Sequence, residues 1–181
     1  MKKIYFFVLI IGLIFGGLQT ASAGRKDESK NYRCHTEQDD RIFCLDEKER
    51  PLSGKRTREV NGHYVSIENY IKGYRDGLST FFDENGKQIE RVYFKQGLKN
   101  GMDKIYYPTG GVKISAQYKN GLLNGQVDVY DDRGKLLGRM RYKNGILYKG
   151  SCRNQNGKDE NFTPEFMAAQ PENQVVTCGA Q

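Results

Sequence analysis

Glycine recurs along the chain every 24 residues, and this interval constrains the fold more than any other feature of the sequence. Aromatic residues keep the same interval. The glycine series are Gly73, Gly97, Gly121 and Gly145; Gly77, Gly101 and Gly125; and Gly62, Gly86, Gly110 and Gly134; the aromatic series are Tyr70, Phe94, Tyr118 and Tyr142, and Phe82, Tyr106 and Tyr130. Such a period is typical of repeat proteins, whose units bury their apolar surface against their neighbours.

Each unit contains two turns of different composition. The four-residue turns, at 83–86, 107–110 and 131–134, carry Asp first or Pro second and end in Gly, as in a type I turn closed by a glycine with positive φ. The two-residue turns, at 72–73, 96–97, 120–121 and 144–145, also end in Gly, and the last two are Asn-Gly, a strong hairpin signal. These interruptions exclude long helices.

The segments between the turns alternate apolar and polar residues and are predicted to be strands. They are 87–95, 111–119 and 135–143, with shorter partners at 78–83, 102–107 and 126–131. The alternation predicts one packed face, formed by Val92, Phe94, Ile114, Ala116, Tyr118, Met140 and Tyr142, and one solvated face, formed by Arg91, Tyr93, Lys113, Ser115, Gln117, Leu137, Arg139 and Arg141.

The predicted fold class is therefore all-β, an elongated antiparallel meander of 24-residue β-hairpin repeats. The series Gly77, Gly101 and Gly125 follows the two-residue turns. We expect these glycines to bend the backbone or to leave room for a side chain of the adjacent unit.

The first 23 residues resemble an export signal. Lys2 and Lys3 precede an apolar run at 4–18, and Ala21-Ser22-Ala23 supplies a cleavage site. We expect residues 1–23 to be removed and the mature protein to be periplasmic or extracellular, with no transmembrane span after cleavage. An uncleaved anchor is the alternative, although the run is shorter than the roughly 20 residues that a span needs.

Four cysteines in an exported chain predict two disulfides. Three pairings exist, and we expect the local one, Cys34 with Cys44 and Cys152 with Cys178; the spacings do not match a paired metal-ligand motif. The predicted organisation is then a polar N-terminus with a disulfide-closed hairpin at 24–50, repeats at 51–150 and a tethered tail at 151–181. Within the tail, 153–161 is predicted as a linker and Thr163-Pro164-Glu165 as a helix start.

The clearest unit is Tyr118-Lys-Asn-Gly121-Leu-Leu-Asn-Gly125, followed by Tyr130-Asp-Asp-Arg-Gly134-Lys-Leu-Leu. It resembles the MORN-type repeats, specifically the bacterial MORN-variant class, and the resemblance covers roughly residues 51–150. It implies an elongated array of β-hairpins that serves as an interaction module; some members are labelled antitoxin-like. Phospholipid binding is proposed for eukaryotic MORN repeats, but their period is shorter and their Gly-x-Gly step after the second turn is lacking here.

No catalytic constellation is found in the sequence. His35 and His63 are far apart, and cysteines engaged in disulfides leave no nucleophile–base pair. Asp128, Asp131 and Asp132 form an acidic cluster, but turn geometry explains the last two better than a calcium site does. We therefore expect no enzymatic activity, no cofactor and no metal.

The candidate binding face consists of Arg91, Tyr93, Lys113, Arg139 and Arg141; the alternative is an ordinary solvated surface. The net charge of +7, or +5 without the two leader lysines, is mixed in sign and does not require a nucleic-acid partner. Two functions follow from this sequence. One is an exported, non-enzymatic module that binds a protein or an anionic envelope component, either a polymer or a lipid. The other is a structural homo-oligomer whose terminal strands pair between chains.

Overall fold

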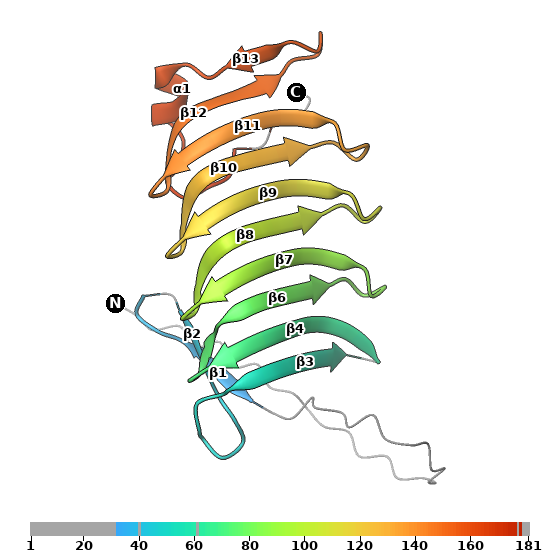
Figure 1. Ribbon diagram of the computed structural model, residues 1–181, viewed down its shortest axis with the longest axis vertical. Helices are drawn as coiled ribbons and strands as arrows, with labels where there is room; N and C mark the ends of the chain where they lie inside the picture. Colours follow the sequence, from blue (N-terminus) through green and yellow to red (C-terminus); the bar gives the residue numbers. More distant parts are fainter. Residues whose placement is uncertain (1–31, 40, 61, 177, 179–181) are drawn as a thin grey trace, which may run out of the picture.

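A computed structural model describes residues 32–39, 41–60, 62–176 and 178. The predicted signal at 1–23 lies outside these residues. The described chain is nearly all β, with one sheet of thirteen strands and one short helix. It forms a tall, single antiparallel sheet whose strands lie across the long axis (Figure 1). The predicted fold class is confirmed.

The strands and the helix follow one another in the chain with these bounds: β1 (Arg33–Thr36), β2 (Ile42–Leu45), β3 (Gly54–Val60), β4 (His63–Ile71), β5 (Tyr74–Arg75), β6 (Gly77–Phe82), β7 (Gln88–Lys95), β8 (Leu98–Tyr106), β9 (Val112–Lys119), β10 (Leu122–Tyr130), β11 (Leu136–Lys143), β12 (Ile146–Arg153), β13 (Asp159–Asn161) and α1 (Pro164–Ala168).

Strands β3, β4 and β6 to β13 form the meander, each antiparallel to the next. The short β5 pairs with the end of β4, and the β1–β2 hairpin joins the sheet there through the pair Phe43↔Tyr74. The disulfide hairpin thus lies beside the turn that follows β4 and does not extend the sheet beyond β3.

The two-residue turns adopt the conformation that their composition predicts. Asn120 and Gly121 both have positive φ, 51° and 82°, as the tight hairpin turn requires. The Gly121 amide donates to the carbonyl of Lys99 in the preceding unit at 2.9 Å. Gly97 and Gly145 make the equivalent bonds. Each of these turns is therefore hydrogen-bonded to the start of the strand that follows the preceding turn, along one long edge of the sheet.

The second glycine series bends the strands, as predicted. Gly101 and Gly125 have φ of 122° and 123°, and the pairing register shifts beside them. A Cβ atom on Gly101 would crowd Tyr93, and one on Gly125 would overlap Gln117. The strands nevertheless continue through these bends, so β8 and β10 begin four residues before the predicted starts at 102 and 126.

The two faces of the sheet differ as the alternation predicts. We call inner the face covered by the β1–β2 hairpin and the C-terminal segment, and outer the opposite face. Inner residues of the long strands are buried, including Val92, Ile114 and Met140. Leu137 is a wrong assignment: it was predicted on the solvated face but is half-buried against the apolar cluster. It follows a register shift next to the turn, where simple alternation no longer holds.

The sheet extends further toward the C-terminus than predicted, because part of the expected linker at 153–161 is strand β13. The Asn154 side-chain oxygen accepts from the amides of Asn156 and Lys158, as Asp131 does from those of Arg133 and Lys135. This turn was missed because Gly157 follows Gly134 by 23 residues instead of 24.

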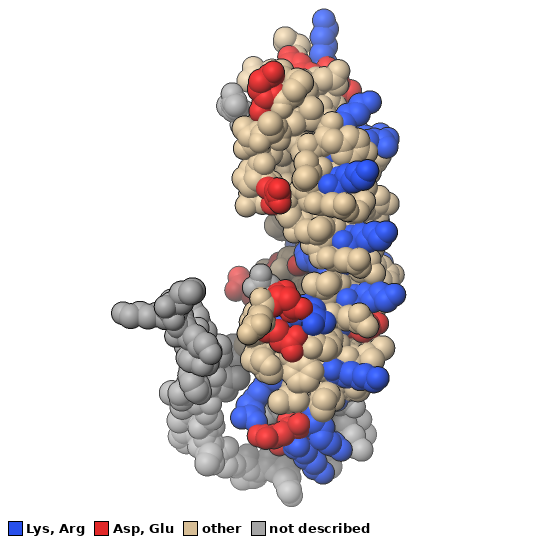
Figure 2. All heavy atoms as spheres, turned by 90° about the vertical axis from the view of Figure 1, so that its left-hand side faces the viewer, with Lys and Arg blue, Asp and Glu red and all other residues tan. Residues whose placement is uncertain are grey.

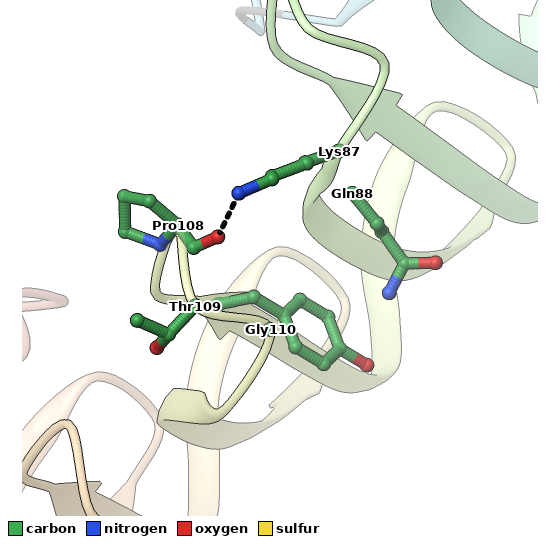
Figure 3. A pocket seen from close by; sticks show the side chains of 6 residues that line it. Lys87, Gln88, Pro108, Thr109 and Gly110 are labelled. Atoms are coloured by element: carbon green, nitrogen blue, oxygen red, sulfur yellow. Dashed lines mark hydrogen bonds between the residues drawn. The ribbon is translucent and has the colours of Figure 1, made fainter.

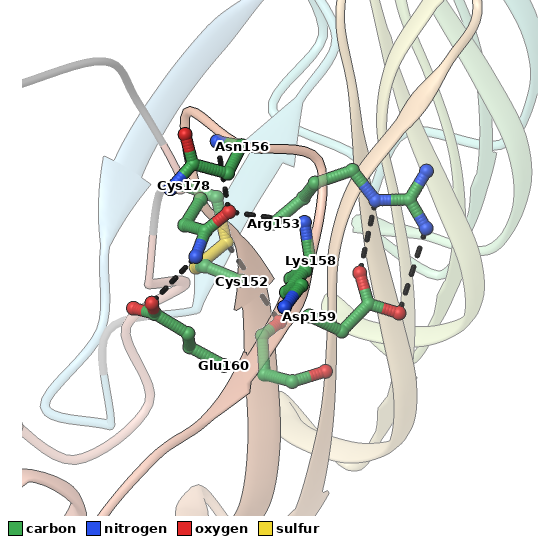
Figure 4. Close-up of polar contacts among 9 residues, drawn as sticks. Cys152, Arg153, Asn156, Lys158, Asp159, Glu160 and Cys178 are labelled. Carbon is green, nitrogen blue, oxygen red and sulfur yellow. Dashed lines mark hydrogen bonds and ion pairs between the residues drawn. A yellow bond between two sulfur atoms is a disulfide. The ribbon is translucent and has the colours of Figure 1, made fainter.

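The chain ends in the predicted short helix and a segment that returns to the sheet. Thr163 caps α1 by accepting from the Phe166 amide at 3.2 Å. Both disulfides have the expected local pairing: Cys34–Cys44 within the β1–β2 hairpin, and Cys152–Cys178 between β12 and the tail (Figure 4). In the described part of the chain, no helix has the length and apolarity needed to cross a membrane.

Candidate interaction surface

The five residues of the candidate binding face are all exposed on the outer face. Arg91 and Tyr93 lie on β7, Lys113 on β9, and Arg139 and Arg141 on β11. Period-2 alternation places them there, because their neighbours on each strand point to the packed face. Figure 2 shows Lys and Arg side chains following one another along this long side of the molecule.

The structure adds cations that the sequence analysis missed. Lys104 pairs across the strands with Arg91, and Lys149 pairs with Arg141. The last residues of β7, β9 and β11 are also exposed lysines: Lys95, Lys119 and Lys143. Their 24-residue spacing could have revealed them, since each occupies the outward position just before a two-residue turn.

Two of the predicted cations are already engaged within the sheet. Arg139 donates to Asp128 through two nitrogens, Nε to Oδ1 at 2.7 Å and Nη2 to Oδ2 at 3.2 Å. The hydrogen bond and charge of Asp128 raise the pKa of Arg139. Lys113 Nζ lies 5.6 Å from the centre of the Tyr107 ring, a cation–π contact. These two side chains are therefore less available to a partner than Arg91 and Arg141.

Apolar side chains alternate with the lysines at the margin of this face. Lys119 pairs across the hairpin with Leu122, and Lys143 with Ile146. Leu122 and Ile146 are 40% and 55% exposed, and Tyr93 is 42% exposed. The surface formed by Arg91, Tyr93, Lys95, Lys119, Leu122, Arg141, Lys143 and Ile146 is called the outer cationic face below. It combines positive charge with apolar contact area.

No ion pair of a Lys or Arg of this surface with a carboxylate occurs among the described residues. The positive field is therefore not cancelled locally, and its range is limited by salt to about 8 Å under physiological conditions. Such a surface is suited to an extended anionic partner.

The acidic cluster does not form a metal site in the described structure. Asp128 binds Arg139, and Asp131 closes its turn by accepting two backbone amides, which confirms the turn interpretation. Within the described ranges, no three potential His, Cys, Asp or Glu ligands converge. His35 and His63 are both exposed and lie on different hairpins.

A shallow depression lies at the long edge formed by the four-residue turns (Figure 3). Lys87, Gln88 and Tyr106 line it together with the turn 108–110. Lys87 Nζ donates to the carbonyl of Pro108 at 3.0 Å, which joins two successive turns. This contact indicates that the depression results from the packing of the turns. Its lining provides neither a nucleophile–base pair nor a pair of carboxylates, and we assign no catalytic role to it.

Buried charges on the inner face were also missed. Glu68 accepts from Ser66 at 2.7 Å and from Tyr70 at 3.0 Å, and it pairs with Arg75. Their presence can be read from the sequence in retrospect, because Glu68 stands at an inward position of β4. The polar side chains of this group bind one another, so we assign the group a structural role.

A second charged group lies on β7 and β8, with Asp103 buried and Glu90 and Lys99 partly exposed. Lys99 Nζ contacts Glu90 at 2.9 Å and Asp103 at 2.6 Å. Burial raises the pKa of Asp103, and the neighbouring Lys99 ammonium only partly offsets this effect. Burial opposes the charged form of Lys99, but its hydrogen bonds to the two carboxylates keep its pKa above the ordinary value.

Comparison with known proteins gives no functional assignment. No family model and no curated protein matches the chain. Among solved structures, S. aureus TarM in complex with fondaparinux, α-GlcNAc-glycerol and UDP is 15% identical over 74% of this chain, with a TM-score of 0.21. Alternansucrase with isomaltononaose is 14% identical over 72%, with a TM-score of 0.13. The chain matches 22% and 16% of the length of these proteins, and neither likeness carries an argument.

Proposed function

We propose that this chain is an exported, non-enzymatic interaction module of the MORN-type repeat class that binds an anionic polymer of the cell envelope or exterior through its outer cationic face. The observation that carries the proposal is the series Lys95, Lys119 and Lys143, one exposed cation per repeat on the same face. The two disulfides and the leader-like N-terminus support export.

The repeat gives the proposed site its spacing. Each unit contributes two strands about 4.8 Å apart, so equivalent lysines recur about every 10 Å along the sheet. A flexible polyanion lying along this axis contacts several cations at once. Each further contact is intramolecular once the first has formed, which raises the overall affinity without any single strong site.

The exposed apolar side chains add to the same surface. Leu122 and Ile146 stand beside Lys119 and Lys143, so a partner with both negative charge and apolar segments contacts both kinds of group. The lysine stems can also lie along apolar surface while their ammonium groups reach the charge.

A charge-reversal experiment tests the proposal with dextran sulfate as the probe and uncharged dextran as the reference. The face variant combines Lys95→Glu, Lys119→Glu and Lys143→Glu. The control combines Lys48→Glu, Arg133→Glu and Lys158→Glu, which are exposed turn residues outside this face. Both variants change the net charge equally. All six positions are on the surface, where substitutions usually change stability by less than about 0.5 kcal/mol.

We expect the face variant to bind dextran sulfate at least about 30-fold more weakly and the control less than about threefold, with binding that falls as salt rises. Affinity lost equally in both variants would show that net charge alone attracts the polymer, and the proposed face would then be wrong. Equal affinity for uncharged dextran would show that binding does not require negative charge on the polymer.

A further inference from the structure

The sheet has two open edges at opposite ends of the molecule. Among the described residues, β3 pairs with β4 alone and β13 pairs with β12 alone (Figure 1). The outward backbone N–H and C=O groups of an edge strand can pair with another strand. The N-terminal hairpin covers the inner face beside β4, and the tail covers the inner face near β12. Both caps therefore lie on a face of the sheet and are not paired to either edge.

The directions of the two edge strands are complementary. From β3 to β13 the meander contains ten strands, each antiparallel to the next. An even number leaves β3 and β13 running in opposite directions. A second copy that is moved along the long axis therefore brings its β3 against β13 in the antiparallel sense. The contact continues the meander without a change of strand direction.

The charges at the two edges are also complementary. Strand β3 carries Lys55, Arg56 and Arg58 with the single acid Glu59, whereas β13 consists of Asp159, Glu160 and Asn161. Arg58 and Glu160 are both exposed. Figure 4 shows Asp159 already bound to Arg153. Glu160 accepts from an asparagine, Asn154, and has no ion pair among the described residues.

The pairing register aligns these two residues. One cross-strand row begins at Arg58 and ends at Glu160: Arg58, Ser66, Phe81, Glu90, Ile105, Ile114, Val129, Gly138, Cys152 and Glu160. If the next copy keeps this register, its Arg58 lies opposite Glu160. The adjacent rows place Thr57 of that copy opposite Asn161, a neutral polar pair, and Glu59 opposite Asp159, whose charge is already paired with Arg153.

Pairing of like edges is disfavoured by the same residues. Two β3 strands paired about Thr57 would place Arg56 opposite Arg58. Two β13 strands paired about Glu160 would place this residue opposite itself. Like charges in directly opposed cross-strand positions are destabilising. The edge chemistry therefore favours contact between unlike ends over a symmetric dimer.

We propose that copies of this protein associate head to tail, with β13 of one copy paired to β3 of the next and Glu160 opposite Arg58. Such a contact uses two different surfaces, so it leaves an unlike open edge at each end and builds rods of increasing length. Main-chain hydrogen bonds supply the attraction, and the charged pair fixes the partner and the register. The proposal is independent of the outer cationic face, which remains uncovered along such a rod.

Two single charge reversals and their mixture test the contact. Sedimentation equilibrium of the purified, oxidised protein should show a mean mass that increases with concentration. Arg58→Glu places two acids in contact and Glu160→Arg places two arginines in contact. Each variant alone should associate about tenfold more weakly.

An equimolar mixture of the two variants should recover association, because every contact between unlike variants again pairs an Arg with a Glu. Arg133→Glu, a reversal in the exposed turn between β10 and β11, is the matched control and should leave self-association unchanged within about twofold. Far-ultraviolet circular dichroism and thermal unfolding verify that each variant is folded.

A wild-type protein that stays monomeric up to millimolar concentration would overturn the proposal. Association that the two reversals leave unchanged, or that their mixture does not restore, would also overturn it. The dextran sulfate experiment has a separate readout, so failure of this contact is distinguishable from failure of the proposed function.

Discussion

The inner face has two parts with the same strand geometry and opposite chemistry. In the N-terminal part, β4 to β8, inward positions carry Glu68, Glu90 and Asp103, with Arg75 and Lys99 as their partners. In the C-terminal part, β9 to β12, the face is apolar and is covered by the tail; its buried members are Ile114, Ala116, Leu123, Val127, Val129, Met140, Tyr142 and Leu147.

The repeat therefore specifies the backbone conformation of each unit but not the interactions that stabilise its inner face. Where the tail supplies Val175, Val176 and Cys178, the face can be apolar because it is shielded from water. Where the tail does not reach, inward carboxylates pair with cations of their own or neighbouring strands, beside the β1–β2 hairpin at β4 and in a partly exposed position at β7 and β8. We therefore expect the two parts to respond differently to loss of a charge, a crosslink or an apolar side chain.

The largest effect is expected from breaking the buried pair in the N-terminal part. Arg75→Met leaves the Glu68 carboxylate, which is 4% exposed, without its cation. Removal of one partner of a buried ion pair costs about 3–5 kcal/mol. Urea unfolding should show this loss, and the double variant Arg75→Met with Glu68→Gln should recover most of it. A double variant no more stable than Arg75→Met would contradict the role assigned to the pair.

The next largest effect is expected from removing the disulfides, which should lower the unfolding free energy by different amounts in the two parts. The chain-entropy model gives about 3.5 kcal/mol for Cys152–Cys178, which spans 26 residues, and about 2.7 kcal/mol for Cys34–Cys44, which spans 10. Replacing each pair with alanines and measuring unfolding in denaturant gives the order. If removal of Cys34–Cys44 lowers the unfolding free energy more than removal of Cys152–Cys178 does, the tail is not the main stabilising element of the C-terminal part.

Shortening a buried apolar side chain should destabilise the C-terminal part, because the substitution leaves a cavity. Leu123 is fully buried, and Leu→Ala at such a site costs about 2–5 kcal/mol. Leu122→Ala is the matched control on the adjacent residue, which is 40% exposed, and should change the unfolding free energy by less than about 0.5 kcal/mol. Similar losses in the two variants would mean that the tail does not shield Leu123.

The smallest expected effect is a pH dependence confined to the N-terminal part. Burial raises the pKa of Asp103 above its ordinary value of 3.8, with Lys99 acting in the opposite direction. The native state thus holds this proton to higher pH than the unfolded chain does. Its contribution to stability is greatest below pH 3.8 and is lost as pH rises through the native pKa.

Asp103→Asn removes this titration. Its unfolding free energy should therefore increase relative to that of the wild type as pH rises from 3 to 7. Asp132→Asn, in an exposed turn, is the control and should leave the pH profile unchanged. A relative loss in Asp103→Asn at neutral pH would show that the Lys99 contact outweighs burial.

The features predictable from the sequence are those carried by local residues. Asn144-Gly145 requires positive φ at both positions, and any chain that contains it between alternating strands turns there. Thr163 before Pro164 likewise begins a helix through its own side chain. The inward position of Val92 and the outward position of Arg91 follow from the same turns.

The features that could not be predicted depend on pairing between units or on segments outside the repeat. Asp128 meets Arg139 only because their strands pair in one register, 11 residues apart in the chain. The tail residue Asn173 accepts from the Leu123 amide and donates to the Gly121 carbonyl. Nothing in the sequence around Asn173 indicates which unit it caps, so the cover of the inner face could not be located from local signals.

The bonded stack of two-residue turns also has a mechanical consequence. Ladder hydrogen bonds of this sheet lie along its long axis, so tension along that axis loads the outermost strand first. The meander should then open one hairpin at a time at low force, each unit of 24 residues releasing roughly 80 Å of chain. The two disulfides prevent the 10- and 26-residue segments that they close at the ends from extending. Single-molecule extension should therefore show a few short steps of equal length, typical of an extensible tether rather than a rigid strut.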